Sequence, residues 1–183
     1  MDLVAQIIEQ VPATSNQFIE FRRLLIQVDR ENSRKKSIRG LARMSQQCKP
    51  EIKPYVNCGL AMAYFLDNDF AHSLFYLKEV VSRSSLSPMA LYAATLIVLI
   101  YRTLGMKRER FEAEGSRLLI MKRIAMQSED PNHRVLALSE LKRELEEREL
   151  HEEAQKCDLE LNYWNSILKK KKTTSKTLVA SNH

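Results

Sequence analysis

Three polar residues, Asp67, Asn68 and Asp69, interrupt a stretch rich in apolar and aromatic side chains, and two carboxylates this close together could bind a metal ion or exchange protons. An EF-hand calcium loop needs alternating oxygen ligands, a glycine at its sixth position and a distal glutamate, and the residues around Asp69 do not supply them. A carboxylate that precedes a helix accepts hydrogen bonds from the first backbone N–H groups and suits the helix dipole. The sequence therefore predicts a turn and a helix cap here.

The remaining reactive side chains do not form a recognisable catalytic or metal motif. The histidines lack HExxH spacing, and Cys48, Cys58 and Cys157 lack CxxC spacing. With 4 Gly in 183 residues there is no phosphate-binding glycine loop, and no G-x-S-x-G elbow or kinase motif set is found. We therefore expect no enzyme, no catalytic residue, no metal site and no cofactor. Three cysteines, an odd number without CxxC spacing, and an N-terminus without a basic signal segment favour a reducing, cytoplasmic location.

Positive charge is concentrated in two segments of a chain that carries 29 Lys and Arg against 23 Asp and Glu, a net charge of +6. One segment is a predicted helix with a cluster made of Arg34, Lys35, Lys36, Arg39 and Arg43. The other is the lysine run at 169–172, without which the net charge is +2. Either cluster could be a solvated surface or could attract an acidic partner or nucleic acid. Because no aromatic side chains are interleaved with the helical cluster, stacking on single-stranded bases is poorly supported.

Helix signals recur along the chain, and 4 Gly and 5 Pro are too few for a turn-rich β fold. Helices are expected at about 18–29, 33–48, 55–66, 70–83, 88–104 and 111–126, with a short one before Pro12 and a long one after Asp130-Pro131. The most apolar stretch, Met89 to Tyr101, has 13 residues and is too short to span a bilayer. The fold class predicted is all-α, with no membrane span.

The C-terminal part is predicted to be a long helix over about 131–168. It carries a seam with spacing 4, 3, 4, 3, 4, formed by Leu150, Ala154, Cys157, Leu161, Trp164 and Leu168. The step from Leu145 to Leu150 breaks the phase, so either one helix changes its face there or two helices meet. The seam either packs back on the domain or forms a homodimer. Residues 169–183 are basic and rich in Thr and Ser, and are expected to be a disordered tail.

A pattern of helical residues repeats after 37 positions. Asn57, Leu60, Ala61 and Tyr64 are matched by Ala94, Ile97, Val98 and Tyr101. Each of these two helices is followed by a second helix, and a helix–turn–helix unit of roughly 34 to 40 residues is typical of stacked helical hairpins. Since one hairpin cannot bury both of its faces, neighbouring hairpins must stack.

With a repeat that begins at Pro54, the sequence resembles the tetratricopeptide repeat (TPR) family. The match consists of Leu60, Ala61 and Tyr64 in the first helix, Asn68, Asp69 and Phe70 in the turn, and Ser73, Leu77 and Val80 in the second helix. In the next repeat Glu114 stands where the family has a small residue. The resemblance implies two to three TPR-like hairpins over about residues 17–127, stacked as a short solenoid within a single helical domain at 1–168.

The resemblance also implies a binding surface, because the first helix of each TPR hairpin forms most of the concave side. The partner-binding candidates are Asn57, Tyr64, Ala94 and Tyr101. The amide of Asn57 could hold a peptide backbone, whereas core packing is the other interpretation of the two tyrosines.

We therefore expect an adaptor or chaperone that binds a peptide or an amphipathic helix of another protein. The chain is similar in size to the cytoplasmic chaperones of bacterial type III secretion systems, which also have short TPR arrays. Nucleic-acid binding through the basic helix at 34–43 and the lysine-rich tail is the alternative hypothesis.

Overall fold

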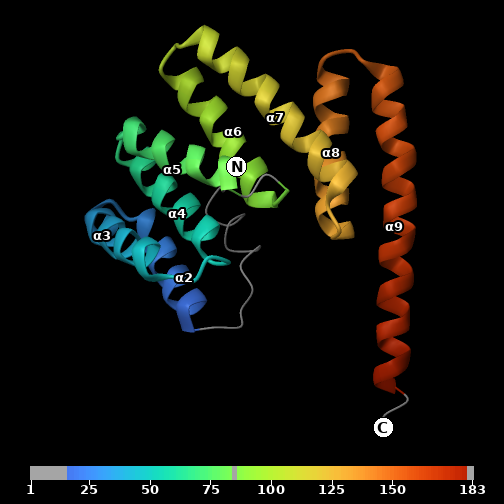
Figure 1. Cartoon of the computed structure of the whole chain (residues 1–183), viewed down its shortest axis with the longest axis horizontal. Helices are drawn as coiled ribbons and strands as arrows, with labels where there is room; N and C mark the ends of the chain where they lie inside the picture. The colour runs from blue at the N-terminus through green and yellow to red at the C-terminus, as the bar shows by residue number, and fades with distance from the viewer. Residues whose placement is uncertain (1–15, 84–85, 181–183) are drawn as a thin grey trace.

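The structure, a computed structural model, describes residues 16–83 and 86–180, and these residues form eight α-helices and no β-strand (Figure 1). In chain order the helices are α2 Asn16–Val28, α3 Glu31–Gln47, α4 Lys53–Leu66, α5 Phe70–Arg83, α6 Pro88–Thr103, α7 Lys107–Gln127, α8 Pro131–Glu147 and α9 His151–Ala180. The all-α prediction is confirmed for this part of the chain, and the helix expected before Pro12 lies outside it. Among the described residues, none of the helices combines the length and the apolar character that a membrane span requires.

Two helices begin at a polar cap followed by proline, as the sequence predicts. The Ser87 hydroxyl accepts a hydrogen bond from the Ala90 N–H at 3.3 Å, and the Asp130 carboxylate accepts one from the Asn132 N–H at 2.8 Å. In both helices proline occupies a first-turn position, where its missing N–H costs no helical hydrogen bond.

The Asp67–Asp69 segment is a turn, as predicted. Asn68 has a φ of 60°, and its N–H donates to the Phe65 carbonyl at 3.0 Å, while the Asp69 N–H donates to the Tyr64 carbonyl at 2.9 Å. This pair of bonds closes the C-terminal end of α4. The Asp69 carboxylate then caps α5 by accepting from the His72 N–H at 3.1 Å.

The same pair of backbone bonds closes two further helices. After α6 the residue with positive φ is Gly105, at 68°, and after α8 it is Glu149, at 60°. Glycine adopts this conformation without strain, whereas glutamate does so at a cost of roughly 1 kcal/mol. Three hairpins, α4–α5, α6–α7 and α8–α9, therefore turn in the same way.

The prediction of one helix over 131–168 is wrong, because the chain reverses between α8 and α9. The phase break between Leu145 and Leu150 marks the place where two helices meet. The reversal lets the apolar stripe of α8 and the seam of α9 cover one another, which a continuous helix would leave exposed. α9 also continues to Ala180, so residues 169–180 are helical rather than disordered.

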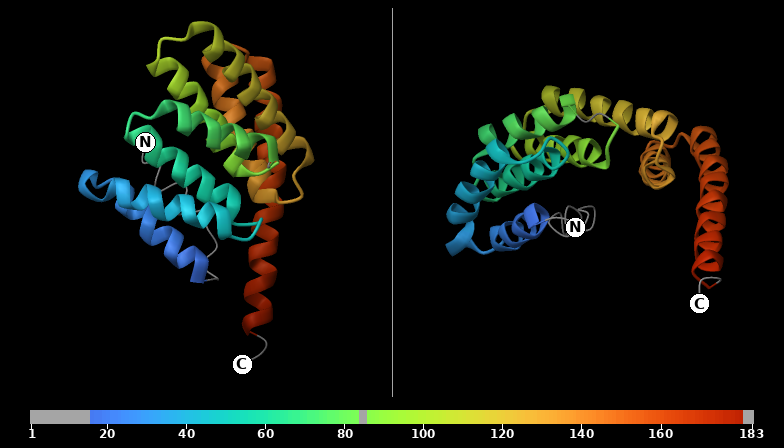
Figure 2. Two further views of the ribbon diagram at one scale, coloured as in Figure 1. Left: turned by 60° about the vertical axis from the view of Figure 1, so that its left-hand side comes forward. Right: turned by 60° about the horizontal axis from the view of Figure 1, so that its bottom comes forward.

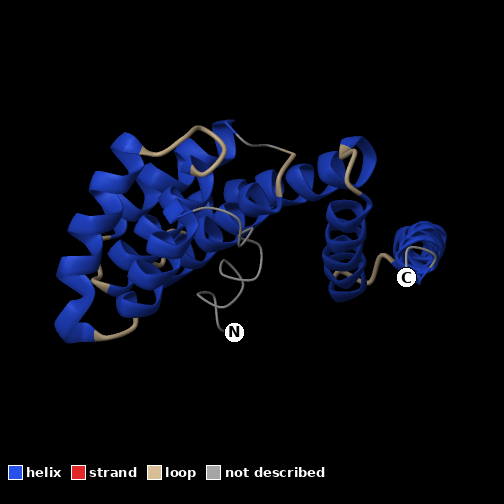
Figure 3. Cartoon of the chain, turned by 90° about the horizontal axis from the view of Figure 1, so that it is seen from below, coloured by secondary structure: helices blue, strands red, loops and turns tan. Residues whose placement is uncertain are grey.

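The hairpins lie side by side in a curved row, with α9 at one end (Figures 2 and 3). Within the row each helix packs on the helices that precede and follow it in the chain. A second set of contacts joins the first helices of the hairpins, α2 to α4, α4 to α6 and α6 to α8.

The hydrophobic core consists of two clusters that share α6. The first runs from α2 to α7 and includes Phe21 and Leu60, and the second joins α6 to α9 and includes Leu138. α6 is apolar on nearly all sides, so Leu96 faces the first cluster while Leu91 faces the second. This helix fixes the two halves of the row against each other.

Candidate functional site

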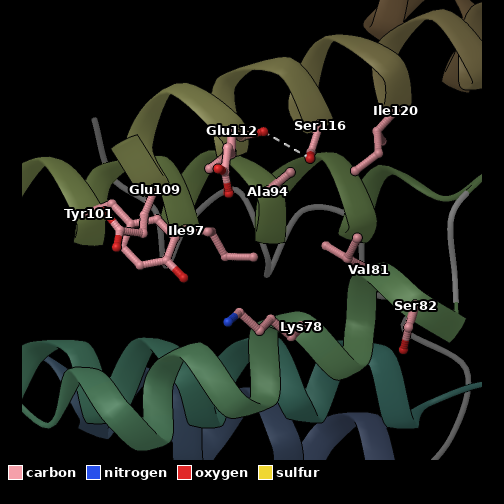
Figure 4. Close-up of a pocket in the computed structure, with 11 residues that line it drawn as sticks. Lys78, Val81, Ser82, Ala94, Ile97, Tyr101, Glu109, Glu112, Ser116 and Ile120 are labelled. Atoms are coloured by element: carbon pink, nitrogen blue, oxygen red, sulfur yellow. Dashed lines mark hydrogen bonds between the residues drawn. The ribbon is translucent and has the colours of Figure 1, made fainter. Parts of the chain in front are cut away.

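A groove of about 330 Å³ opens between α5, α6 and α7 (Figure 4). Its base is apolar and is formed by Val81 from α5, Ala94 and Ile97 from α6, and Ala113 and Ile120 from α7. One turn of an α-helix with its side chains occupies a cylinder of roughly 420 Å³. The groove is therefore the right size for two or three side chains of a partner rather than for a whole helix.

The rim of the groove is polar. Glu109, Glu112 and Ser116 stand on α7, Lys78 stands on α5, and Tyr101 lies beside Glu109 at one end (Figure 4). The Ser116 hydroxyl donates to the backbone carbonyl of Glu112 at 3.0 Å. A polar rim around an apolar base is the usual arrangement of a site that binds part of another molecule.

Of the four predicted binding residues, Ala94 and Tyr101 line the groove, and Asn57 and Tyr64 do not. Asn57 is only 2% exposed. Its side-chain oxygen accepts from the Ser45 hydroxyl at 2.6 Å, and its side-chain nitrogen donates to Glu79 at 3.1 Å. Both ends of the amide are thus used inside the protein, where they join α4 to α3 and α5.

Tyr64 packs within its own hairpin. Its ring stacks on His72 and Tyr76 of α5, at centroid distances of 4.9 and 5.9 Å. Burial raises the pKa of the Tyr64 hydroxyl, which is consistent with a structural role.

The predicted basic cluster divides into one structural residue and four exposed ones. Arg34 donates from Nε to the Val28 carbonyl at 3.1 Å and from Nη1 to the Leu66 carbonyl at 2.8 Å, so it caps the ends of α2 and α4. The exposed residues are Lys35, Lys36, Arg39 and Arg43, which we call the α3 basic stripe. None of the four forms an ion pair with any residue that the structure describes.

The α9 seam packs on α8. Ala154, Cys157 and Leu161 are buried there, so these three are not available to a second copy of the chain. The opposite face of α9 carries Leu159 and Tyr163, which are 67% and 61% exposed.

The reactive side chains have the environments of structural residues. All three cysteines are free thiols, and burial raises the pKa of Cys48, Cys58 and Cys157, whereas a nucleophilic thiolate needs a lowered pKa. Within residues 16–83 and 86–180, no group of three or more His, Cys, Asp or Glu side chains is placed to hold a metal ion.

The sequence analysis did not select Lys78 or Glu109, which lie on opposite walls of the groove. Charged residues on a helix face usually indicate only solvation. Their significance depends on the distance between α5 and α7, which lie in different hairpins, so no local sequence signal identifies them. The walls of the groove are the second helices α5 and α7, and the first helix α6 contributes to its base.

Comparisons with protein-family models, with curated proteins and with solved structures give no significant match to this chain.

Proposed function

We propose that this protein is an adaptor or chaperone that binds a short segment of a partner protein in the groove between α5, α6 and α7. The observation that carries the proposal is the groove itself, with its apolar base and polar rim. Its volume suits a few side chains of a peptide or of one face of an amphipathic helix. The proposal includes no enzymatic activity and no cofactor.

We also propose a TPR-like architecture for the hairpins. Three of them share one turn geometry, and the turns at Asn68 and Gly105 are separated by the 37-residue spacing of the sequence pattern. The contacts among first helices agree with a stacked array. A type III secretion chaperone in the cytoplasm is the narrower form of the proposal, and the three free thiols fit a reducing compartment.

Blocking the groove tests the main proposal. Ser116 is exposed at the rim, so Ser116→Trp fills the groove without entering the core. The matched control is Ser139→Trp on α8, because both hydroxyls are exposed and donate to the carbonyl four residues earlier in the same helix. Peptides that bind the full chain are first selected from a random heptapeptide display library. Their affinities for the wild type and for both variants are then measured by fluorescence anisotropy.

The expected result is that Ser116→Trp weakens binding of the selected peptides at least tenfold and that Ser139→Trp leaves it unchanged. Equal binding by the wild type and Ser116→Trp, with circular dichroism showing both folded, would falsify the groove as the binding site. If Ser116→Trp does not fold, Ser82→Trp on the opposite wall serves as the second variant.

Nucleic-acid binding is the second candidate, and the α3 basic stripe, which forms no ion pair with a described residue, is the observation that favours it. Four phosphate contacts predict that the logarithm of the binding constant for duplex DNA falls with the logarithm of the salt concentration with a slope of about −3.6. Changing the stripe to glutamine should remove that part of the slope, and changing the lysines at 169–172, at the other end of the molecule, measures the part that the tail contributes (Figure 1). A shallow slope that the stripe variant does not alter excludes this function.

A homodimer through the C-terminal helix remains part of the proposal in an altered form. Because the seam is occupied by α8, a second copy would contact Leu159 and Tyr163 on the opposite face of α9.

A further inference from the structure

We propose that the groove selects partner segments in which an apolar side chain stands between a cationic and an anionic one, with the cation bound by Glu109 and the anion by Lys78. This inference rests on the proposed function, because it assigns the chemistry of the segment that the groove binds. It follows from how the charges at the rim are paired.

Glu109 is the acidic residue of α7 that has no ion pair among the described residues. Two later carboxylates of the helix are occupied, since Glu112 contacts Arg108 at 3.1 Å and Glu114 contacts Arg110 at 3.4 Å. Glu109 is half-buried in the first turn of α7, where the helix dipole stabilises a negative charge. Its carboxylate therefore offers a fixed, partly desolvated acceptor for a lysine, an arginine or an amine.

Lys78 has the corresponding position on α5. It is exposed and forms no ion pair with a described residue. The adjacent acid, Glu79, is engaged by Asn57 at 3.1 Å, by Arg83 at 3.4 Å and by Lys53 at 4.0 Å. The ammonium group of Lys78 is thus left to contact whatever enters the groove.

The two charges stand on opposite walls and do not pair with each other, and the apolar base lies between them (Figure 4). Across the groove, the cation Lys78 is followed by the apolar surface with Ala94 and Ile97 and then by the anion Glu109. A segment that contacts all three parts must present an acidic group, an apolar anchor and a basic group in that order. Side chains on one face of an extended segment are about 7 Å apart, so about five residues supply all three.

Charge order also gives the bound segment a direction. A segment that enters the groove in reverse would place its basic group against Lys78 and its acidic group against Glu109, and both contacts would be repulsive. Ion pairs at an exposed rim are each worth a factor of roughly two to five in affinity. Replacing two attractions by two repulsions should change the affinity about tenfold or more.

Single charge reversals test the inference. Lys78→Glu in the full chain gives the groove two acidic walls, and Glu109→Lys gives it two basic walls. The matched controls make the same charge changes at an exposed pair outside the groove, Arg143→Glu and Glu147→Lys on α8. The same random heptapeptide library is selected on the wild type, on the four single variants and on Ser116→Trp, and circular dichroism checks that each is folded.

We expect the wild type and the α8 controls to select peptides with one acidic and one basic residue around an apolar residue. Lys78→Glu should select peptides with two basic residues around the apolar one, and Glu109→Lys should select peptides with two acidic residues. Each class should bind its own protein at least about fivefold more tightly than the others, and the preference should weaken in 0.5 M salt. Peptides that Ser116→Trp loses, but whose charges are the same for the wild type, Lys78→Glu and Glu109→Lys, overturn this inference and leave the proposed function intact. Peptides that bind Ser116→Trp as well as wild type overturn both.

Discussion

The α4–α5 and α8–α9 hairpins have the same turn but different surroundings. α4 lies between α2 and α6, and eight consecutive residues, Val56 to Ala63, are buried. α9 lies at the end of the row and buries only one stripe against α8, while Leu159 and Tyr163 on its opposite face are exposed. The turn therefore sets the geometry of a hairpin, and its position in the row determines how firmly that hairpin is held.

This difference should appear in the native-state dynamics. In a row of hairpins each unit is stabilised by its own contacts and by those with its neighbours, so a unit at the end loses less when it opens. Local opening free energies in proteins range from near zero at ends to the global value in the core. The α8–α9 hairpin should open while α4–α5 remains closed.

Thiol labelling measures this contrast directly, since Cys58 lies in α4 and Cys157 in α9. Cys58 is fully buried and its thiol donates to the Met89 carbonyl at 3.8 Å. We expect maleimide to label Cys157 about 100-fold faster than Cys58 in the native protein, which corresponds to an opening free energy lower by about 3 kcal/mol. Mass spectrometry of single-cysteine variants gives both rates.

Unfolded protein in guanidinium chloride provides the control, because both thiols should then react at similar rates. Equal labelling rates in the native state would show that the two hairpins open together, and the contrast between the end and the interior of the row would be wrong.

A second test concerns a carboxylate that joins two neighbouring hairpins. Glu144 on α8 contacts Arg117 of α7, and its other oxygen accepts from Arg148 Nη2 at 2.8 Å. The Glu144 and Arg117 side chains are both 13% exposed. Glu144→Ala should lower the free energy of unfolding by about 2–3 kcal/mol in guanidinium titrations, because it leaves a largely buried guanidinium without its carboxylate.

Two other glutamates calibrate that value. Glu146, 52% exposed and 3.8 Å from Lys142, is the control on the same helix, and Glu146→Ala should cost less than about 0.5 kcal/mol. Glu79, which contacts Asn57 and Lys53 of α4 within its own hairpin, is 21% exposed and should give an intermediate loss. If Glu144→Ala and Glu146→Ala have equal effects, the α7–α8 contact does not depend on this ion pair.

The sequence predicted those helices and turns whose signals are local. Ser87-Pro88 and Asp130-Pro131 begin helices, and Asn68 and Gly105 are residue types that tolerate a positive φ. Between Leu145 and Leu150 the phase break left two alternatives open. Glutamate at 149 gives no local turn signal, so the turn there depends on tertiary packing of the α9 seam on α8.

The candidate site depended still more on tertiary structure. Of the binding candidates selected from the repeat pattern, Ala94 and Tyr101 line one groove, whereas the amide of Asn57 forms hydrogen bonds inside the protein. Glu114, which stands where the TPR family has a small residue, follows the buried Ala113 in α7. Side-chain direction, rather than residue type, decides these cases.

The smallest expected effect concerns the turns themselves. Glu149→Gly should raise the free energy of unfolding by about 0.5–1 kcal/mol, since relief of the left-handed strain outweighs the entropy that glycine adds to the unfolded chain. Gly105→Ala should lower it by about 1 kcal/mol, and this cost is purely conformational because nothing lies within 4 Å of the added Cβ. Asn68→Gly should change little, because asparagine already tolerates this conformation.

Thermal and guanidinium unfolding give the change in the free energy of unfolding for each of the three variants, so the three turns can be compared directly. A gain from Glu149→Gly that also slows the labelling of Cys157 would show that turn strain contributes to the weak hold on the terminal hairpin. If Glu149→Gly raises the free energy of unfolding but does not slow the labelling of Cys157, the easy opening of the terminal hairpin is due only to its missing neighbour.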